Sequence, residues 1–167
     1  MTISNSDAKD RLLHEELEQE LSEEGISVLK SDLTRPWGGF FVIDDTSIEA
    51  FLKRFFPDLE NDHDAPLSPK ILFVEPGKRL SWQYHDRRSE EWLVIKGRVG
   101  GIISDSDKQG EITELESGDR ISVGRRQRHR LVGLGDWGIV AEIWKHTDPE
   151  NPSDEEDIVR LEDDFGR

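Results

Sequence analysis

The sequence contains no cysteine among its 167 residues. Disulfide bonds and thiolate metal ligands are therefore excluded, and any metal must be held by nitrogen and oxygen donors. Long apolar runs are also missing, and residues 1–10 are mostly polar. We therefore expect no membrane span, no secretory signal and no membrane partner, which makes the cytoplasm the expected location.

Positive charge is scarce, since 22 basic residues stand against 37 acidic ones and the formal net charge is -15. This balance argues against nucleic acid as a partner, because neutralising phosphates needs the opposite sign. A salt-adapted surface and an ordinary acidic bacterial protein explain the composition equally well. An anionic small molecule would need local basic side chains to overcome the overall field.

Residues 7–24 have the pattern of an amphipathic helix that ends at Gly25. We treat residues 1–25 as a separate helical element. Such a helix can form a dimer contact, act as a lid, or pack on the outside of its own domain. Its expected apolar stripe consists of Leu12, Leu13, Leu17 and Leu21.

Residues 26–167 are long enough for one domain with a real core. Short β-like segments recur at intervals of about ten residues and are joined by glycine, aspartate and serine turns. This pattern predicts an all-β domain, an antiparallel barrel or jelly roll. Residues 48–56 are the exception, because a capping pattern precedes them and Pro57 follows, so we expect a short peripheral helix there.

The segment from Pro76 to Gly97, PGKRLSWQYHDRRSEEWLVIKG, concentrates potential metal ligands. The period of two in a strand puts Ser81, Gln83 and His85 on one face. A polar turn then leads to a second β-like segment that begins at Glu90, so pairing brings this carboxylate towards the first strand. The remaining ligand is expected to be His129, which stands on a later short β-like segment.

Two imidazoles, one carboxylate and one amide oxygen suit a single divalent transition metal with open positions for substrate oxygens. Zinc is the first expectation, and manganese, iron, cobalt and nickel are alternatives. A metal-free barrel with hydrogen-bonded polar residues is the competing interpretation. It is disfavoured because burying glutamine, histidine and glutamate together is costly without an ion.

These segments resemble the two motifs of the cupin superfamily, with Gln83 in place of the first histidine. Among cupins, the sequence is most similar to the cupin domain of type II mannose-6-phosphate isomerases, here in a free-standing small form. The resemblance covers roughly residues 33–167. Besides the ligand segments, it rests on Arg35-Pro36-Trp37-Gly38, on Arg128-His129-Arg130-Leu131 and on the ending from Asp157 to Arg167.

The resemblance implies that Lys70 lies near the sugar, where an ammonium group can stabilise a developing enediolate. A surface lysine is the alternative. Arg35 is expected to meet a phosphate, although Arg35 and Trp37 would also serve as loop anchors, and Arg88 would either bind phosphate or brace its turn. We expect Lys70 and Arg130 to act in catalysis. The expected substrate-binding residues are Arg35, Trp37, Ser81, Arg88 and Arg160.

The implied function is a metal-dependent aldose–ketose isomerase of a phosphorylated sugar, most simply mannose 6-phosphate and fructose 6-phosphate. A phosphoheptose or lyxose-type isomerase uses the same chemistry, and a non-catalytic cupin that binds a sugar or metal is the alternative from another class. The proton-transferring base stays open between a carboxylate, Lys70 and a water on the metal. No glycine-rich phosphate loop precedes the barrel, so nucleotide transfer is not expected. The expected partners are a sugar phosphate and a second copy of the chain.

Overall fold

Turn residues divide the chain into short strands, as the spacing predicts. The computed structural model of the protein describes residues 5–62 and 64–166, and this part of the chain forms eleven strands and two α-helices. The elements in chain order are α1 (Asn5–Glu23), β1 (Val28–Arg35), β2 (Gly38–Ile43), the 3₁₀ turn η1 (Asp45–Ser47), α2 (Ile48–Phe55), β3 (Leu67–Val74), β4 (Trp82–Tyr84), β5 (Arg88–Lys96), β6 (Arg98–Ser104), β7 (Thr113–Glu116), β8 (Arg120–Val123), β9 (Arg128–Gly133), β10 (Gly138–His146) and β11 (Val159–Glu162).

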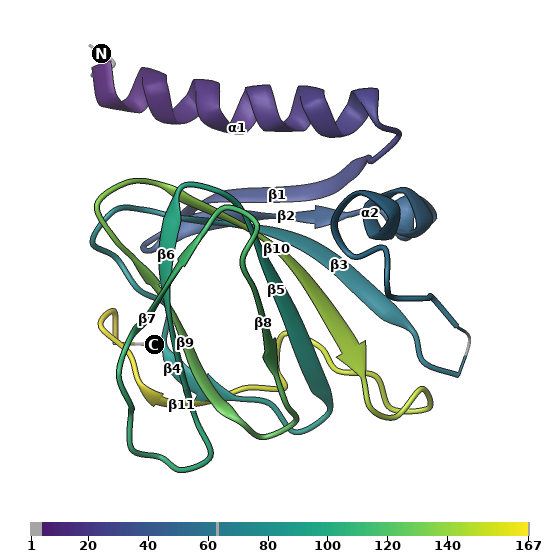
Figure 1. Cartoon of the computed structure of the whole chain (residues 1–167), viewed down its shortest axis with the longest axis vertical. Helices are drawn as coiled ribbons and strands as arrows, with labels where there is room; N and C mark the ends of the chain where they lie inside the picture. Colours follow the sequence, from purple (N-terminus) through teal and green to yellow (C-terminus); the bar gives the residue numbers. More distant parts are fainter. Residues whose placement is uncertain (1–4, 63, 167) are drawn as a thin grey trace.

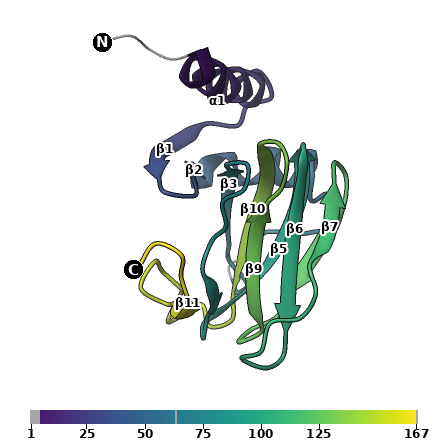
Figure 2. The same ribbon diagram turned by 90° about the vertical axis from the view of Figure 1, so that its left-hand side faces the viewer.

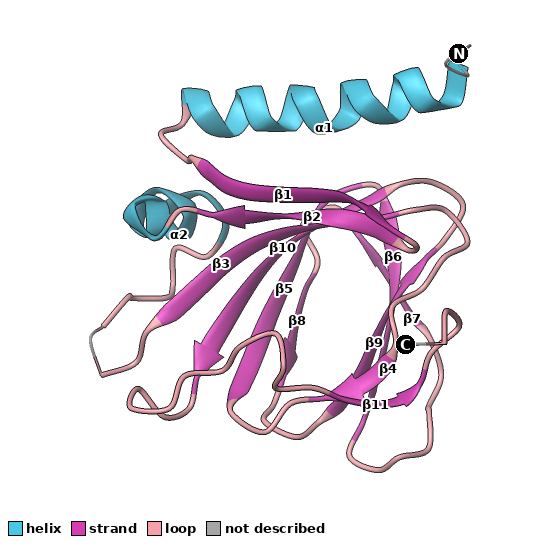
Figure 3. Ribbon diagram, turned by 180° about the vertical axis from the view of Figure 1, so that it is seen from behind, coloured by secondary structure: helices cyan, strands magenta, loops and turns pink. Residues whose placement is uncertain are grey.

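The strands form two antiparallel sheets that face each other across a barrel interior (Figure 1). The larger sheet has the order β1-β2-β3-β10-β5-β8, and the smaller one has the order β11-β4-β9-β6-β7. Seen from behind, α2 lies beside the larger sheet and β11 borders the open end of the barrel (Figure 3). The antiparallel barrel with an amino-terminal helix and a short peripheral helix is therefore confirmed.

Alternation along the strands gives the larger sheet two faces of different character. In the central strand β10, Ile139, Ala141 and Ile143 belong to an apolar cluster that also contains residues of α1 and α2. We call this side the outer face. Val140 belongs to a second apolar cluster, which includes residues from both sheets, so β10 contributes alternate side chains to the barrel interior. We call that side the inner face.

Helix α1 lies over β1, at the edge of the larger sheet (Figure 2). Leu17 and Leu21 are buried in the outer-face cluster, as the helical spacing predicts. Leu12, however, is 53% exposed, and the buried stripe instead includes His14, which packs edge-on against Phe73 and Trp137. The buried face of α1 is thus turned slightly about the helix axis from the face that the leucines alone predict.

Gly97 makes the tight connection between β5 and β6. Its φ of 71° lies in the left-handed region, and a Cβ at this position would lie 2.1 Å from the carbonyl oxygen of Trp137. Only glycine therefore fits here without moving the backbone. None of the helices in residues 5–62 and 64–166 combines the length and the apolar character needed to cross a membrane.

Candidate metal centre

The expected ligands come from three strands that belong to both sheets. Gln83 in β4 pairs directly with His129 in β9, and directly opposed residues present their side chains on the same face. His85 follows β4, and the next turn carries the chain across to β5 in the other sheet, where Glu90 stands. The pairing expected between these two segments is therefore wrong, because β4 pairs with β9 and β11 while β5 pairs with β10 and β8. The short turn across the gap between the sheets nevertheless brings Glu90 towards His85.

The three strongest donors converge in the buried interior. The Nε2 atom of His85 lies 3.1 Å from Nε2 of His129 and 3.2 Å from Oε1 of Glu90. The Nε2 atom of His129 lies 3.6 Å from Oε2 of Glu90. All three side chains are about 2% exposed, and one ligand atom from each lies within 4.8 Å of the others.

The hydrogen bonds of the two rings decide which ring nitrogens carry the proton. Nδ1 of His85 lies 2.7 Å from the carbonyl oxygen of Asp157, and Nδ1 of His129 lies 2.9 Å from that of Gln127. Since a carbonyl only accepts, both Nδ1 atoms carry the proton and both Nε2 atoms present lone pairs. Nε2 of His129 therefore faces the Nε2 lone pair of His85 and a carboxylate oxygen of Glu90. These electron-rich atoms repel one another, and a cation bound among them would stabilise the arrangement. The residues fit a divalent transition metal.

Electrostatics support ligands in their binding-competent protonation states. Burial lowers the pKa of His129 to about 4, so this ring is neutral near pH 7. Burial alone would raise the pKa of Glu90, but its interactions with His85, the Arg88 guanidinium and His129 outweigh burial and hold the pKa well below the usual value. Glu90 is therefore an ionised carboxylate, and His129 offers a lone pair.

Gln83 lies at the edge of this cluster rather than in its centre. Its amide oxygen accepts a hydrogen bond from the Ser81 hydroxyl, and its amide nitrogen lies 3.3 Å from Nε2 of His85. A rotation of the amide by half a turn exchanges the two atoms and turns the oxygen towards the imidazoles. Its role as fourth ligand stays a prediction.

Arg88 braces the centre. Its guanidinium donates to Oε1 of Glu90 at 2.9 Å and to the Ser153 hydroxyl at 2.9 Å, and it lies 3.5 Å from the centroid of the Trp144 ring. Arg88 is 6% exposed. These contacts favour the bracing role over phosphate binding, because few of its donors are left to meet a ligand.

The segment before β11 holds the turn that carries His85. The Asp157 carboxylate accepts the backbone N–H groups of Asp86 and Arg87 at 2.9 and 3.0 Å, and it also accepts the Ser153 hydroxyl. Burial would raise the pKa of Asp157, but these hydrogen bonds, led by that from Ser153, hold it below the usual value. The sequence analysis placed Asp157 only at the start of the ending that carries the family resemblance, so its support for the centre was missed.

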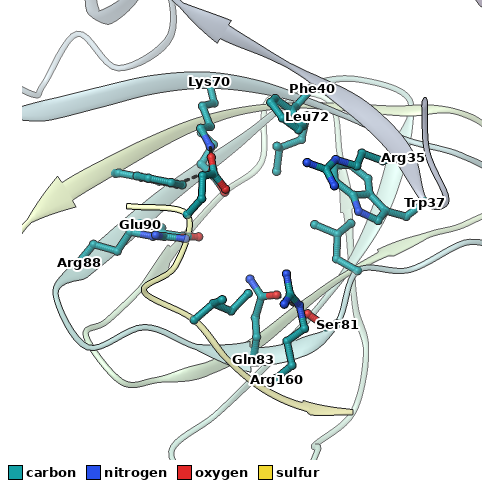
Figure 4. A pocket seen from close by; sticks show the side chains of 15 residues that line it. Arg35, Trp37, Phe40, Lys70, Leu72, Ser81, Gln83, Arg88, Glu90 and Arg160 are labelled. Carbon is teal, nitrogen blue, oxygen red and sulfur yellow. Dashed lines mark hydrogen bonds and ion pairs between the residues drawn. The ribbon is translucent and has the colours of Figure 1, made fainter. Parts of the chain in front are cut away.

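A pocket with an interior volume of about 120 Å³ opens beside the expected ligands. Figure 4 shows Arg88 and Glu90 on one side of it and Arg35 and Trp37 on the opposite side. Six of the seven residues expected in catalysis or substrate binding line this pocket. They are Arg35, Trp37, Lys70, Ser81, Arg88 and Arg160.

Lys70 lies in the pocket wall on β3 and is 8% exposed. Its ammonium pairs with Glu155 at 2.5 Å and stands 3.9 Å from the centroid of the Trp144 ring. The lysine is therefore not the solvated surface residue that the alternative interpretation described.

Arg130 is not among the residues that line the pocket. It follows His129 in β9, so alternation turns its side chain to the opposite face of the smaller sheet. It is fully buried there, donates to the carbonyl oxygen of Leu80 at 2.7 Å, and pairs with Glu162 and Asp164 at 3.5 and 3.6 Å. This position does not support the catalytic role expected for Arg130, and its contacts instead connect β9 to the segment around β11.

Glu142 also lines the pocket, although it belongs to none of the motifs that indicated the site. It is 6% exposed, and its two oxygens accept the indole N–H groups of Trp144 at 2.7 Å and Trp92 at 2.9 Å. Burial, with the negative charge of Glu90, raises the pKa of Glu142 to about 8. An isolated acid in the apolar strand GIVAEIW was the available signal, because strands of this kind rarely bury a carboxyl without a purpose.

Comparison with known proteins identifies the family. Residues 60–163 match the family described as "Mannose-6-phosphate isomerase C-terminal". The chain belongs to this family. The matched range contains the four expected ligands, whereas Arg35 and Trp37 lie before it.

Curated relatives are much longer than this chain. A mannose-1-phosphate guanylyltransferase of Sinorhizobium fredii is 30% identical over 110 residues, which are 66% of this chain and 17% of that protein. The alginate biosynthesis protein AlgA of Pseudomonas aeruginosa is 29% identical over 169 residues, covering 100% of this chain and 29% of that protein. The chain thus spans less than a third of the length of either relative.

Solved structures show the same fold at low identity. KdgF from a Halomonas species aligns with a TM-score of 0.52 at 14% identity, covering 76% of this chain and 89% of that one. A structure of oxalate oxidase aligns with a TM-score of 0.51 at 16% identity, covering 71% of this chain and 56% of that one. The fold is that of the cupin barrel, which confirms the resemblance drawn from the motifs.

Proposed function

We propose that this protein is a metal-dependent aldose–ketose isomerase of a phosphorylated sugar, with mannose 6-phosphate and fructose 6-phosphate as the first candidates. The observation that carries the proposal is the buried convergence of His85, Glu90 and His129 at the side of a pocket that also contains basic side chains. Membership in the family described as mannose-6-phosphate isomerase C-terminal supports the same substrate class.

The basic groups are distributed in a way that suits a phosphorylated sugar. Arg35 and Arg160 lie away from Glu90 in the pocket, on the far side and below (Figure 4). A phosphate held by these two arginines leaves the other end of an extended sugar next to the ligand cluster. Because the whole protein carries a charge of -15, such local donors are needed to attract an anion.

The chain's own residues supply the remaining parts of the proposed chemistry. A divalent metal held by His85, Glu90, His129 and Gln83 would polarise the sugar carbonyl and stabilise negative charge on its oxygen, and we propose zinc as that metal. Lys70 contributes positive charge in the pocket wall, and Trp37 and Leu72 exclude water from part of it. Ser81 fixes the amide of Gln83.

The deciding experiment is an isomerase assay of the metal-loaded protein on hexose, heptose and pentose phosphates beside the free sugars. We expect interconversion of mannose 6-phosphate and fructose 6-phosphate, with solvent deuterium entering at C1 or C2 in heavy water. Arg35→Ala and Arg160→Ala should raise KM for phosphorylated sugars. Arg98→Ala is the matched control, because Arg98 is 61% exposed and does not line the pocket.

The outcomes separate the proposal from its alternatives. Turnover of a heptose phosphate or of free lyxose, without turnover of mannose 6-phosphate, would change the substrate but keep the reaction. Thermal protection by the sugars without any turnover would replace the enzyme by a sugar-binding cupin. The guanylyltransferase name of the Sinorhizobium relative adds no reaction to this proposal, since the chain covers 17% of that protein.

We also propose that residues 1–25 form a helical element outside a barrel domain at residues 26–167, and that the protein works in the cytoplasm. We further propose that two copies associate through α1 and β1. Supporting the association, Leu12 of α1 and Leu29 and Leu33 of β1 are 53%, 66% and 39% exposed. Light scattering should give a dimer for the full chain, and Leu29→Asp should shift it towards the monomer. A monomeric full chain would overturn this assembly.

A further inference from the structure

The pocket contains a buried carboxyl group that the metal cluster does not use. Glu142 stands at the centre of the inner face, where its cross-strand partners are Lys70 in β3 and Trp92 in β5. Trp144, two residues further along β10, is opposite Glu90. Period-two alternation therefore puts Glu142, Lys70 and Glu90 on one surface, and all three line the same pocket.

Two rigid donors fix this carboxyl group while leaving it able to react. Trp144 donates to one oxygen and Trp92 to the other, at 2.7 and 2.9 Å. The Trp92 indole also reaches Oε2 of Glu90 at 3.1 Å, so a single side chain connects the carboxyl group to the ligand cluster. A carboxylate has about four lone-pair positions, and two indoles occupy only half of them.

The other carboxyl groups of the pocket are already engaged. Glu90 is in the ligand cluster, and Glu155 pairs with Lys70. Among the described residues that line the pocket, Glu142 is the carboxyl group without a basic hydrogen-bond partner or a position in the cluster. Burial and the charge of Glu90 raise its pKa to about 8. A carboxyl group whose pKa lies near the operating pH can both take and return a proton, as a general base requires.

We propose that Glu142 carries the proton between C1 and C2 of the sugar, an inference that rests on the proposed isomerase function. Its carboxylate takes the proton from C2 of the open-chain aldose. The C–H electron pair forms the C1=C2 bond, and the C1=O π pair moves to O1. The hydroxyl proton of C2 passes to O1, C2=O forms, and Glu142 returns its proton to C1. The carboxylate is regenerated, and no proton or electron is left over.

Lys70 is suited to assist this step without donating the carbon-bound proton. It is the cross-strand neighbour of Glu142, and its ammonium lies over the ring of Trp144, which itself donates to Glu142. A cation next to the reacting carbons stabilises the negative charge that builds on the oxygen when the C–H bond breaks. The neighbouring pair thus combines a base with an electrostatic stabiliser.

The test compares Glu142→Gln with Glu91→Gln. Glu91 is also 6% exposed and belongs to the same sheet, but it binds Arg120, Ser122 and Lys145 and does not line the pocket. We expect Glu142→Gln to lower kcat by about 10²–10⁴-fold, with metal content and KM little changed. Solvent deuterium exchange should fall equally, whereas Glu91→Gln should keep wild-type turnover.

A second measurement, which does not depend on turnover, monitors the indole groups of Trp92 and Trp144. In metal-free wild-type protein, the indole N–H signals of Trp92 and Trp144 in nuclear magnetic resonance spectra should shift together as Glu142 titrates. Glu142→Gln should abolish this joint titration. Signals of Trp92 and Trp144 that titrate unchanged in Glu142→Gln would overturn the assigned contact.

Each further outcome decides the inference. A kcat for Glu142→Gln within threefold of that for Glu91→Gln overturns it and leaves the isomerase function standing. Loss of bound metal in Glu142→Gln assigns a structural role instead and also overturns it. Wild-type protein without turnover removes the proposed function and this inference with it. If Glu142→Gln does not fold, Glu142→Asp replaces it as the test. This variant displaces the carboxyl group by one methylene and should lower kcat by about 10²-fold. An unchanged kcat would overturn the proposal.

Discussion

The two faces of the larger sheet are made from alternate residues of the same strands, yet they have opposite composition. On the outer face, β10 contributes Ile139, Ala141 and Ile143 to an apolar cluster with α1 and α2. On the inner face, the same strand carries Glu142 and Trp144 beside Lys70 and Glu90. Both faces are buried, so exposure to solvent does not explain the difference.

The contrast indicates that the outer face mainly stabilises the fold and that the inner face carries the groups suited to chemistry. Burying apolar side chains on the outer face stabilises the fold by about 25 cal/mol per Å². Burying carboxyl groups and ammonium groups on the inner face costs free energy unless each is paired, and here the pairs are indoles, imidazoles and guanidinium. Such a surface is suited to binding a ligand, and burial on the outer face offsets its cost.

The largest effect should come from removing a ligand on the inner side. We expect His129→Ala to reduce the metal content from about one ion per chain to almost none, because the remaining donors no longer enclose the ion. Elemental analysis of protein purified without chelator measures this. His14→Ala is the matched control, since His14 is a buried histidine packed against Phe73 on the outer side. Stoichiometric metal in both His85→Ala and His129→Ala would rule out the centre.

A core substitution on the outer face should lower the stability of the fold and leave the metal content unchanged. Leu21 is 2% exposed between α1 and the sheet. Leu21→Ala should lower the free energy of unfolding by about 2–5 kcal/mol through lost burial and a residual cavity. Denaturant titration measures the loss, and the metal content of the folded protein should stay unchanged. Metal loss without destabilisation would contradict the separation of the two faces.

A graded effect should appear when pH is varied in metal-free protein. The pKa of Glu142 is about 8 in the folded state against an ordinary value of 4.5. Below pH 4.5 both states hold the proton, and between 4.5 and about 8 only the folded state keeps it. The contribution of Glu142 to the free energy of unfolding therefore declines across this interval and is lost above about 8. Glu142→Gln should flatten the decline in denaturant titrations, and an identical pH profile would contradict the shift.

The smallest effect on stability should come from the ion pair at the pocket wall. The Glu155 side chain is 72% exposed, so Glu155→Gln should change the free energy of unfolding by less than about 1 kcal/mol. Its removal frees Lys70 for a phosphorylated ligand, and KM should fall. Glu156→Gln, an exposed neighbour in the same segment, is the control. A rise in KM in Glu155→Gln alone would show instead that Glu155 helps to bind the sugar.

The motif spacing was sufficient to predict the ligand cluster, although the predicted pairing of β4 with β5 was wrong, because the connection between these strands is short. Once β4 and β5 are joined by a short turn, His85 and Glu90 must approach each other, and His129 joins them through the pairing of β9 with β4. The barrel itself followed from the regular turns. These predictions depend on periods of two and on short connections, which a sequence displays directly.

Other features depend on distant pairings that no local pattern contains. The indoles that hold Glu142 come from β5 and β10, and their register appears only in the folded sheet. Arg130 was expected in catalysis, yet alternation turns it to the face opposite His129, and this rule could have been applied to the sequence. The stripe of α1 likewise includes His14 because the sheet below offers aromatic edges to it.

The hydrogen bond between His85 and the Asp157 carbonyl has a consequence for the order of assembly during synthesis. These residues are 72 positions apart, so the support for this ring is absent until the segment around Asp157 has emerged from the ribosome. By then every ligand has already been translated, because His129 precedes Asp157. A nascent chain that has exposed β1 to β10, but neither the segment around Asp157 nor β11, should therefore hold a metal weakly. Metal capture should then be a late event that reports completion of the fold.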